Sequence, residues 1–181
     1  MGHEELHLED RVLLATQLGE SHFREFKSAL QRDGHADTTP RPVKHICKDI
    51  AETLVAFANA DGGELLVGVE DDGTITGCPH GGTQIKGMLE APKRNVHRDT
   101  PLPTPRLYKG QIDKKTILYF QVSKSPDIIL TSDGRCLQRF DRENRPVSPQ
   151  RITADRQMEI SREYDRDFVL TARLDDLDFE L

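Results

Sequence analysis

The sequence predicts an α+β domain with a mixed or antiparallel sheet and flanking helices. Apolar residues recur every three to four positions over 44–60, which is typical of a buried helix face. Residues 64–70 and 115–123 are short apolar runs with the length of buried strands. Asp-Gly turn signals at 72–73 and 133–134 favour hairpins over a regular, doubly wound parallel sheet.

The first third of the chain predicts a helix, a strand, a loop and a second helix. Residues 9–19 have a short apolar side that ends at a glycine, which indicates a helix. Residues 22–27 alternate and predict a strand with Phe26 in the core. The Pro-, Gly- and Thr-rich residues 31–43 predict a loop, and the helix over 44–60 follows it.

The rest of the chain predicts strands more often than helices. We expect a helix over 82–90, then a basic, proline-containing loop over 91–103. A final helix is expected from Ser148, as its cap, with Pro149 at its first position. Strands are expected over 64–70, 74–76, 104–109, 115–123, 128–131 and 135–140.

Length and composition predict one domain in a cytoplasmic protein. A chain of 181 residues fits a single domain, which we place at residues 1–170. Residues 171–181 are acidic and are expected to form a tail or a linker. No apolar run approaches the roughly 20 residues that span a bilayer, and the acidic start lacks a signal-peptide layout. Three widely spaced cysteines fit a reducing compartment.

Charge is unevenly distributed along the chain, although the net charge is −6. Residues 1–79 carry 7 Lys and Arg against 15 Asp and Glu, whereas residues 80–130 carry 9 against 4. A basic rim can bind phosphate in a protein of negative total charge, although ordinary surface scatter also explains this pattern. Aromatic residues are isolated, so no base-stacking platform is predicted. The residues expected to contact phosphate are Lys93, Arg94, Arg98 and Arg139.

Carboxylates gather at two places where predicted elements end. Glu20 and Glu25 flank a helix-to-strand junction, and Gly19 would let the chain turn between them. Glu70 and its two acidic neighbours at 71–72 crowd the end of a strand. Hard divalent ions such as Mg²⁺ prefer oxygen ligands, although turn formation also explains acids at a strand end.

Taken together, these stretches resemble one family. Residues 20–27 follow the pattern E-S-x-x-x-E-F-K, and the helix then ends N-x-x-G-G at 59–63. Residues 68–77 follow G-V-x-D-D-G-x-I-x-G. Residues 136–140 and 145–148 are similar to a closing strand and the start of a final helix. The order of these motifs resembles the Schlafen AlbA-type domain, also called the divergent Alba-like DNA-binding domain.

The resemblance spans about residues 12–160, and it implies a nucleic-acid partner. Some relatives are metal-dependent endoribonucleases that cut structured RNA such as tRNA with two glutamates and an aspartate. By motif position, Glu20 and Glu25 take the glutamate places. Asp71 is then the third carboxylate, with Glu70 as the reserve.

The chemistry of phosphodiester cleavage suits these residue types. One or two Mg²⁺ or Mn²⁺ ions held by Glu20, Glu25 and Asp71 would neutralise the phosphate and activate a nucleophile. Lys27, which shares a strand face with Glu25, could hold the developing negative charge. The alternative is that Lys27 is an ordinary solvent-exposed lysine on a strand, without a catalytic role.

Three functions follow from these expectations. The first is a divalent-metal endonuclease acting on RNA or single-stranded DNA. The second is a non-catalytic DNA- or RNA-binding regulatory module, in which the acids only shape the fold. The third is a ligand-sensing or protein-interaction domain. No membrane partner is expected, while a homo-oligomer or fusion to further domains remains open.

Overall fold

A computed structural model describes residues 3–33 and 37–171 of the chain. The chain divides into two compact units, Met1–Pro146 and Val147–Leu181, and the second contains one described helix. The acidic tail expected from the sequence lies outside the described residues from position 172 onward. The elements are α1 (His3–Leu18), β1 (Arg24–Lys27), β2 (Leu30–Asp33), β3 (Asp37–Pro40), α2 (Val43–Asn59), β4 (Gly62–Val67), α3 (Gly82–Leu89), α4 (Ala91–Arg94), β5 (Arg106–Ile112), β6 (Lys115–Ser123), β7 (Leu137–Phe140), β8 (Glu143–Pro146) and α5 (Pro149–Thr171).

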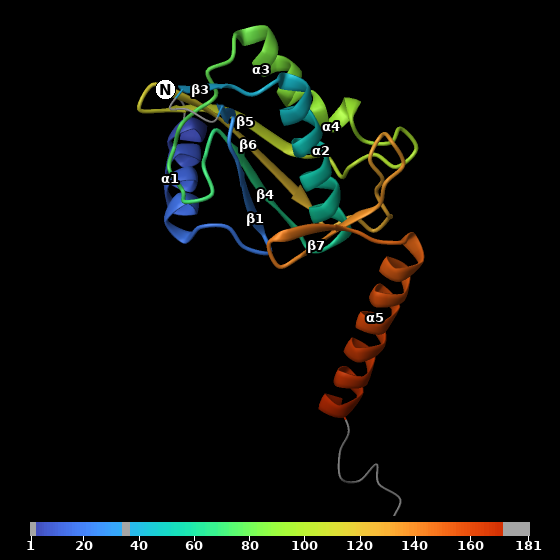
Figure 1. Ribbon diagram of the computed structural model, residues 1–181. Coiled ribbons are helices and arrows are strands. Elements are labelled where there is room, and N and C mark those ends of the chain that lie inside the picture. Colours follow the sequence, from blue (N-terminus) through green and yellow to red (C-terminus); the bar gives the residue numbers. More distant parts are fainter. Residues whose placement is uncertain (1–2, 34–36, 172–181) are drawn as a thin grey trace, which may run out of the picture. The chain divides into compact units, whose positions relative to one another are not determined.

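The central sheet has four strands in the order β1-β4-β6-β5 (Figure 1). β1 runs parallel to β4, whereas β4 with β6 and β5 with β6 are antiparallel. The sheet is therefore mixed, which confirms the α+β class expected from the sequence. β1 and β5 are the two edge strands, so a feature on β1 and a feature beside β5 lie at opposite edges.

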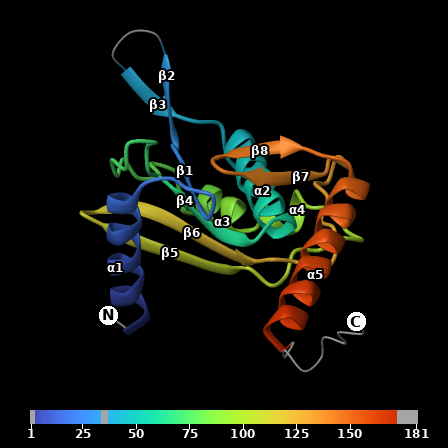
Figure 2. The ribbon, with the colours of Figure 1, turned by 90° about the horizontal axis from the view of Figure 1, so that it is seen from below.

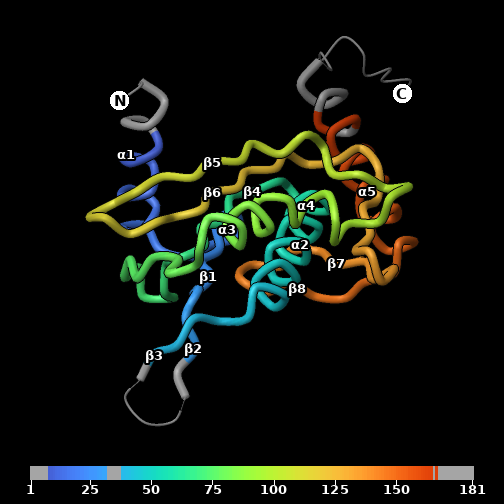
Figure 3. Tube along the Cα trace, turned by 90° about the horizontal axis from the view of Figure 1, so that it is seen from above, coloured from blue at the N-terminus to red at the C-terminus, as the bar shows by residue number. Residues whose placement is uncertain are grey.

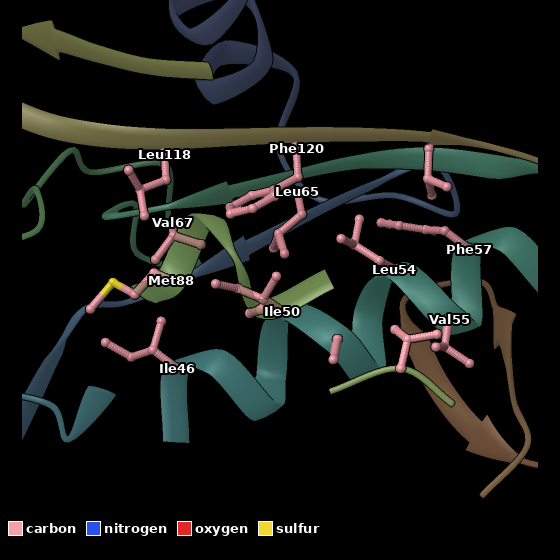
Figure 4. Close-up of a cluster of buried hydrophobic side chains, with 14 of the residues drawn as sticks. Ile46, Ile50, Leu54, Val55, Phe57, Leu65, Val67, Met88, Leu118 and Phe120 are labelled. Atoms are coloured by element: carbon pink, nitrogen blue, oxygen red, sulfur yellow. The ribbon is translucent and has the colours of Figure 1, made fainter. Parts of the chain in front are cut away.

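The larger core lies between α2 and one face of the sheet (Figure 4). The stripe expected on α2 from apolar spacing is buried, which confirms this helix. Burying a Leu, Ile or Phe side chain contributes about 1.5–3 kcal/mol, so this face is a major source of stability. Its fully buried members include Ile46, Ile50, Leu54 and Phe57 of α2 and Leu65, Val67, Leu118 and Phe120 of the sheet.

A smaller core lies on the other face of the sheet, where α1 packs. Val12 and Ala15 of α1 join Phe26, Leu66 and Tyr119 there, and all of them are buried. Side chains alternate along a strand, so the neighbours of Phe26 on β1 face the α2 side. The expectation that Phe26 lies in the core is confirmed.

Gly62 joins α2 to β4 in a conformation that suits glycine. Its φ is 81°, and a Cβ atom there would lie 2.8 Å from the backbone oxygen of Val122. The close approach of β6 therefore excludes a side chain at this position. This tight connection fixes where β4 begins and, through the sheet register, the position of its partner strands.

Several elements differ from the sequence expectations. Residues 31–43 contain β2 and β3, which form a two-stranded ribbon projecting from the rest of this unit (Figures 2 and 3). Pro40 is tolerated because it ends a strand of a two-stranded ribbon. Residues 128–131 form only an isolated bridge from Thr131 to Val96. β8 was not expected, because its segment is polar and exposed.

The second unit begins as expected, with Pro149 as the first residue of α5. The hydroxyl of Ser148 accepts a hydrogen bond from the amide of Arg151 at 3.3 Å, which caps the helix. Across residues 3–33 and 37–171, no helix is both long enough and apolar enough to span a membrane.

Candidate functional site

The first carboxylate of the candidate site lies where α1 gives way to β1. Gly19 follows α1 with a left-handed φ of 72°. Ser21 and Arg24 then exchange backbone hydrogen bonds of 2.9 and 3.3 Å, which turn the chain. The turn brings Oε1 of Glu20 to the amide of Phe26, which donates to it at 2.9 Å. Glu20 therefore satisfies a backbone donor on the edge strand.

Glu25, the second carboxylate, is buried between two cations. Its side chain is 7% exposed on the α2 side of the sheet. Oε1 pairs with the ammonium of Lys27 on the same strand face. Oε2 lies 2.6 Å from Nη2 of Arg139, which comes from β7. Each carboxylate oxygen thus faces one positive charge, which offsets the cost of burying the anion.

Arg139 is a structural residue rather than a phosphate contact. Its side chain is 0% exposed, which contradicts the prediction that it binds nucleic acid. It donates to Oδ1 of Asn144 and to the backbone oxygen of Ser21, both at 2.9 Å. Its guanidinium carbon lies 5.1 Å from the centroid of the Phe57 ring. These contacts tie the β7–β8 hairpin to the start of β1.

The third carboxylate position lies beyond β4. Glu70 is engaged by the fold, since its Oε1 accepts hydrogen bonds from Ser28 at 2.7 Å and Thr76 at 2.6 Å. Asp72 accepts a 2.9 Å bond from the amide two residues further on, as expected in a turn. Asp71 is exposed between them. Among the described hydrogen bonds, none uses the carboxylate of Asp71, whereas Glu70 and Asp72 each accept at least one.

Electrostatics link the four predicted catalytic side chains. Partial burial raises the pKa of the Glu20 carboxyl above its ordinary value, and the hydrogen bond from the Phe26 amide opposes that shift. The negative charges of Glu25 and Asp71 raise the same pKa further, whereas Lys27 lowers it. Glu25, Asp71 and Lys27 therefore each lie within electrostatic reach of Glu20.

The carboxylates do not fit a three-ligand Mg²⁺ or Mn²⁺ site in this arrangement. Both oxygens of Glu25 face cations, and one oxygen of Glu20 accepts a backbone amide. A metal ion bound by Glu25 would have to displace Lys27 or share the carboxylate with Arg139. Among the described residues, no group of three or more His, Cys, Asp or Glu side chains is placed to hold a metal ion.

The other three residues expected to bind phosphate lie between α3 and β5 in the chain, near the opposite edge of the sheet. Lys93, Arg94 and Arg98 are exposed. Arg94 forms an ion pair with Glu90 one helical turn earlier. Within the described part of the chain, no ion pair is found for Lys93 or Arg98. Two positive charges without a described ion pair therefore face solvent within six residues of each other.

Lys93, Arg94 and Arg98 line part of a cavity of about 840 Å³. The segment that carries them is anchored, because the amide of His97 donates to the oxygen of Leu130 at 2.9 Å. The amide of Ser132 donates to the oxygen of Asn95 at the same distance. Residues 91–103, expected as a simple loop, instead contain α4 (Figure 1). Several of these residues line the cavity. The sequence showed the charges but not the concavity, which arises from long-range packing.

A buried polar cluster around Glu64 was missed from the sequence. Glu64 is 3% exposed, and Nε of Arg24 donates to its Oε1 at 2.7 Å. Oε2 accepts from Nε of Arg11 at 2.9 Å and from the Tyr119 hydroxyl at 2.8 Å. Burial, reinforced by Glu64, raises the pKa of Tyr119 to about 12. The sequence offered one signal for this cluster, a single glutamate within an apolar strand. The role of Glu64 is structural.

Comparison with known proteins gives one family match and several matches of fold. The sequence model of the family described as Schlafen, AlbA_2 matches residues 20–148, which include both the carboxylates and the cationic segment. No curated protein matches the chain.

Two solved structures are similar to this chain. The crystal structure of the DIP2311 protein from Corynebacterium diphtheriae has a TM-score of 0.55 and 21% sequence identity, covering 70% of this chain and 22% of that protein. This chain therefore spans about a fifth of the length of that protein, and the likeness concerns the fold. The solution structure of the N-terminal domain of a protein described as RecG-related, from Nitrosomonas europaea, is 24% identical. Its TM-score is 0.43, and the match covers 64% of this chain and 72% of that domain.

Proposed function

Because the chain belongs to the Schlafen, AlbA_2 family, we propose that it binds nucleic acid through the exposed cations Lys93 and Arg98. Family membership supports a nucleic-acid-related domain. The observation that carries the proposal is the anchored segment between α3 and β5, where these two charges face solvent beside a cavity. A local basic patch binds phosphate even when the total charge is −6.

The arrangement of charge on the fold is consistent with this proposal. The acids Glu20, Glu25 and Asp71 lie near the β1 edge or the end of β4, away from the β5 edge. A phosphate bound at Lys93 and Arg98 would therefore lie away from these acids. Contacts from Lys and Arg to phosphate are insensitive to sequence and weaken with salt, so we expect binding of this kind.

The experiment is a binding titration with a labelled RNA of about 12 nucleotides. Replacing both cations, Lys93→Glu with Arg98→Glu, should weaken binding at low salt by at least about tenfold. A matched control with the same charge change, Lys44→Glu with Lys109→Glu, alters exposed lysines elsewhere in this unit and should leave affinity within about threefold of the parent. Equal losses in both variants would show that only total charge matters. Absence of binding by the parent would overturn the proposal.

A metal-dependent endonuclease is the second candidate, and one observation favours it. The raised pKa of Glu20 reflects the nearby charges of Glu25 and Asp71 as well as burial, and a divalent ion would offset such repulsion. Against it stand the two cations on Glu25. Our first choice is therefore binding without cleavage.

Cleavage assays separate the two candidates. We expect tRNA and single-stranded DNA to remain intact with the protein and Mg²⁺ or Mn²⁺. Metal-dependent cleavage that is lost in both Glu20→Gln and Asp71→Asn would establish the nuclease instead. Both substitutions keep the size of the side chain, and Gln at position 20 keeps the oxygen that accepts the Phe26 amide.

A further inference from the structure

We propose that the cavity beside Lys93 and Arg98 accepts one unpaired nucleobase, so that the domain selects single-stranded over double-stranded nucleic acid. This inference rests on the proposed function and adds the form of the ligand. It concerns the interior of the cavity, whereas phosphate binding concerns the cations around it. Base binding in the cavity and phosphate binding by the cations can therefore be refuted independently.

Much of the cavity lining is apolar. Pro92 and Val96 are buried, and Leu102 and Leu107 are partly buried against the larger core. This surface suits the flat face of a base, which gains free energy by leaving water. Lys93 and Arg98 on the same lining attract an anion, so the cavity complements a ligand with an apolar ring and a phosphate.

Polar groups on the lining match the edge of a base. Thr104 and Ser132 carry hydroxyls that donate and accept hydrogen bonds, and both residues are exposed. The described side-chain bonds do not use either hydroxyl, so both can contact a ligand. Nδ1 of His97 already accepts the amide of Asp99 at 3.3 Å, which orients that ring. A largely apolar pocket with few polar groups is the usual form of a small-ligand site.

The cavity has room for a base that leaves its strand, and its wall is preformed. A volume of about 840 Å³ lies within the roughly 300–1,000 Å³ of ligand pockets. The wall is held by the backbone bonds of His97 and Ser132, so it exists before a ligand arrives. Bases in a duplex are stacked and paired, so only an unpaired base can enter at low cost. The imidazole of His97 lines the cavity, so this ring, guanidinium planes and proline rings would hold the base.

The test compares one RNA oligonucleotide as a single strand and as a duplex. We expect roughly fivefold or greater preference for the single strand, the low end of what one held base contributes. Thr104→Leu with Ser132→Leu narrows the cavity with aliphatic groups, at exposed positions and without a change of charge. This variant should lose the preference but keep duplex binding. Lys93→Glu with Arg98→Glu should weaken both forms.

A second readout needs no substitution. A strand containing 2-aminopurine should gain fluorescence on binding, because a base in the cavity leaves its stacked neighbours. Equal affinity for single-stranded and duplex RNA would overturn the proposal that the cavity binds a base. So would a preference for the single strand that survives in Thr104→Leu/Ser132→Leu while the fluorescence stays unchanged. Either result would leave the proposal of phosphate binding intact. Absence of binding to either form would overturn both proposals.

Discussion

Replacing Arg139 with methionine should be among the most destabilising single changes in this domain. The substitution keeps an apolar stem of similar length, so packing on Phe57 is largely retained. It removes the charge that lies 2.6 Å from Glu25 and the hydrogen bonds to Asn144 and Ser21. Breaking a buried ion pair costs about 3–5 kcal/mol. Since Lys27 remains beside Glu25, we expect a loss of about 3 kcal/mol, the low end of that range.

Urea denaturation followed by circular dichroism measures this loss. The double variant Glu25→Gln/Arg139→Met should recover part of it, because the remaining buried group is no longer an unpaired charge. Arg139→Lys is the matched control that keeps the charge but not the planar donor set. A loss below about 1 kcal/mol for Arg139→Met would refute the assignment of Arg139 as a buried structural cation. So would a loss that Glu25→Gln leaves unchanged.

Two further predictions concern titration and reactivity. Burial raises the pKa of the Glu20 carboxyl in the folded chain above its ordinary value of 4.5. The folded chain therefore keeps the carboxyl proton to a higher pH than the unfolded chain does. The free energy of unfolding falls as the pH rises from 4.5 to the pKa of the folded chain. The urea midpoint of Glu20→Gln should therefore be higher than that of the parent at pH 7 and equal to it near pH 4. Variant and parent midpoints that are equal at both pH values would contradict this prediction. Burial raises the pKa of Cys78 to about 12, so a thiol reagent near pH 8 should modify the partly exposed Cys47 first and Cys78 only after unfolding. Simultaneous labelling of both would show that Cys78 is accessible.

Local patterns predicted most of the elements that build the sheet and its larger core. The apolar spacing over 44–60 predicted α2, and the short apolar run at 115–123 predicted β6. Both elements form where the sequence places them. The β2–β3 ribbon was missed because Pro and Gly usually indicate loops, while two short strands can still pair with each other. β8 was missed because it is exposed, and pairing with β7 rather than burial defines it.

The candidate site was only partly accessible to sequence reasoning. Motif order located Glu20, Glu25 and Asp71, and the structure places Glu25 and Asp71 within electrostatic reach of Glu20. Sequence could not show that Arg139 would fold back onto Glu25, because the two are far apart along the chain and the contact depends on β7 docking. The same holds for the cavity, since its walls come from α4, the start of β5 and residue 132.

The salt dependence of binding tests the central claim most directly. The logarithm of the binding constant for a single-stranded oligonucleotide falls with the logarithm of salt concentration by about 0.7 for each phosphate contacted. If Lys93 and Arg98 each contact one phosphate, Lys93→Glu/Arg98→Glu should reduce that slope by about 1.4. The control Lys44→Glu/Lys109→Glu should keep the slope of the parent. A charge-reversed variant with the same slope and affinity as the parent would contradict binding through this segment.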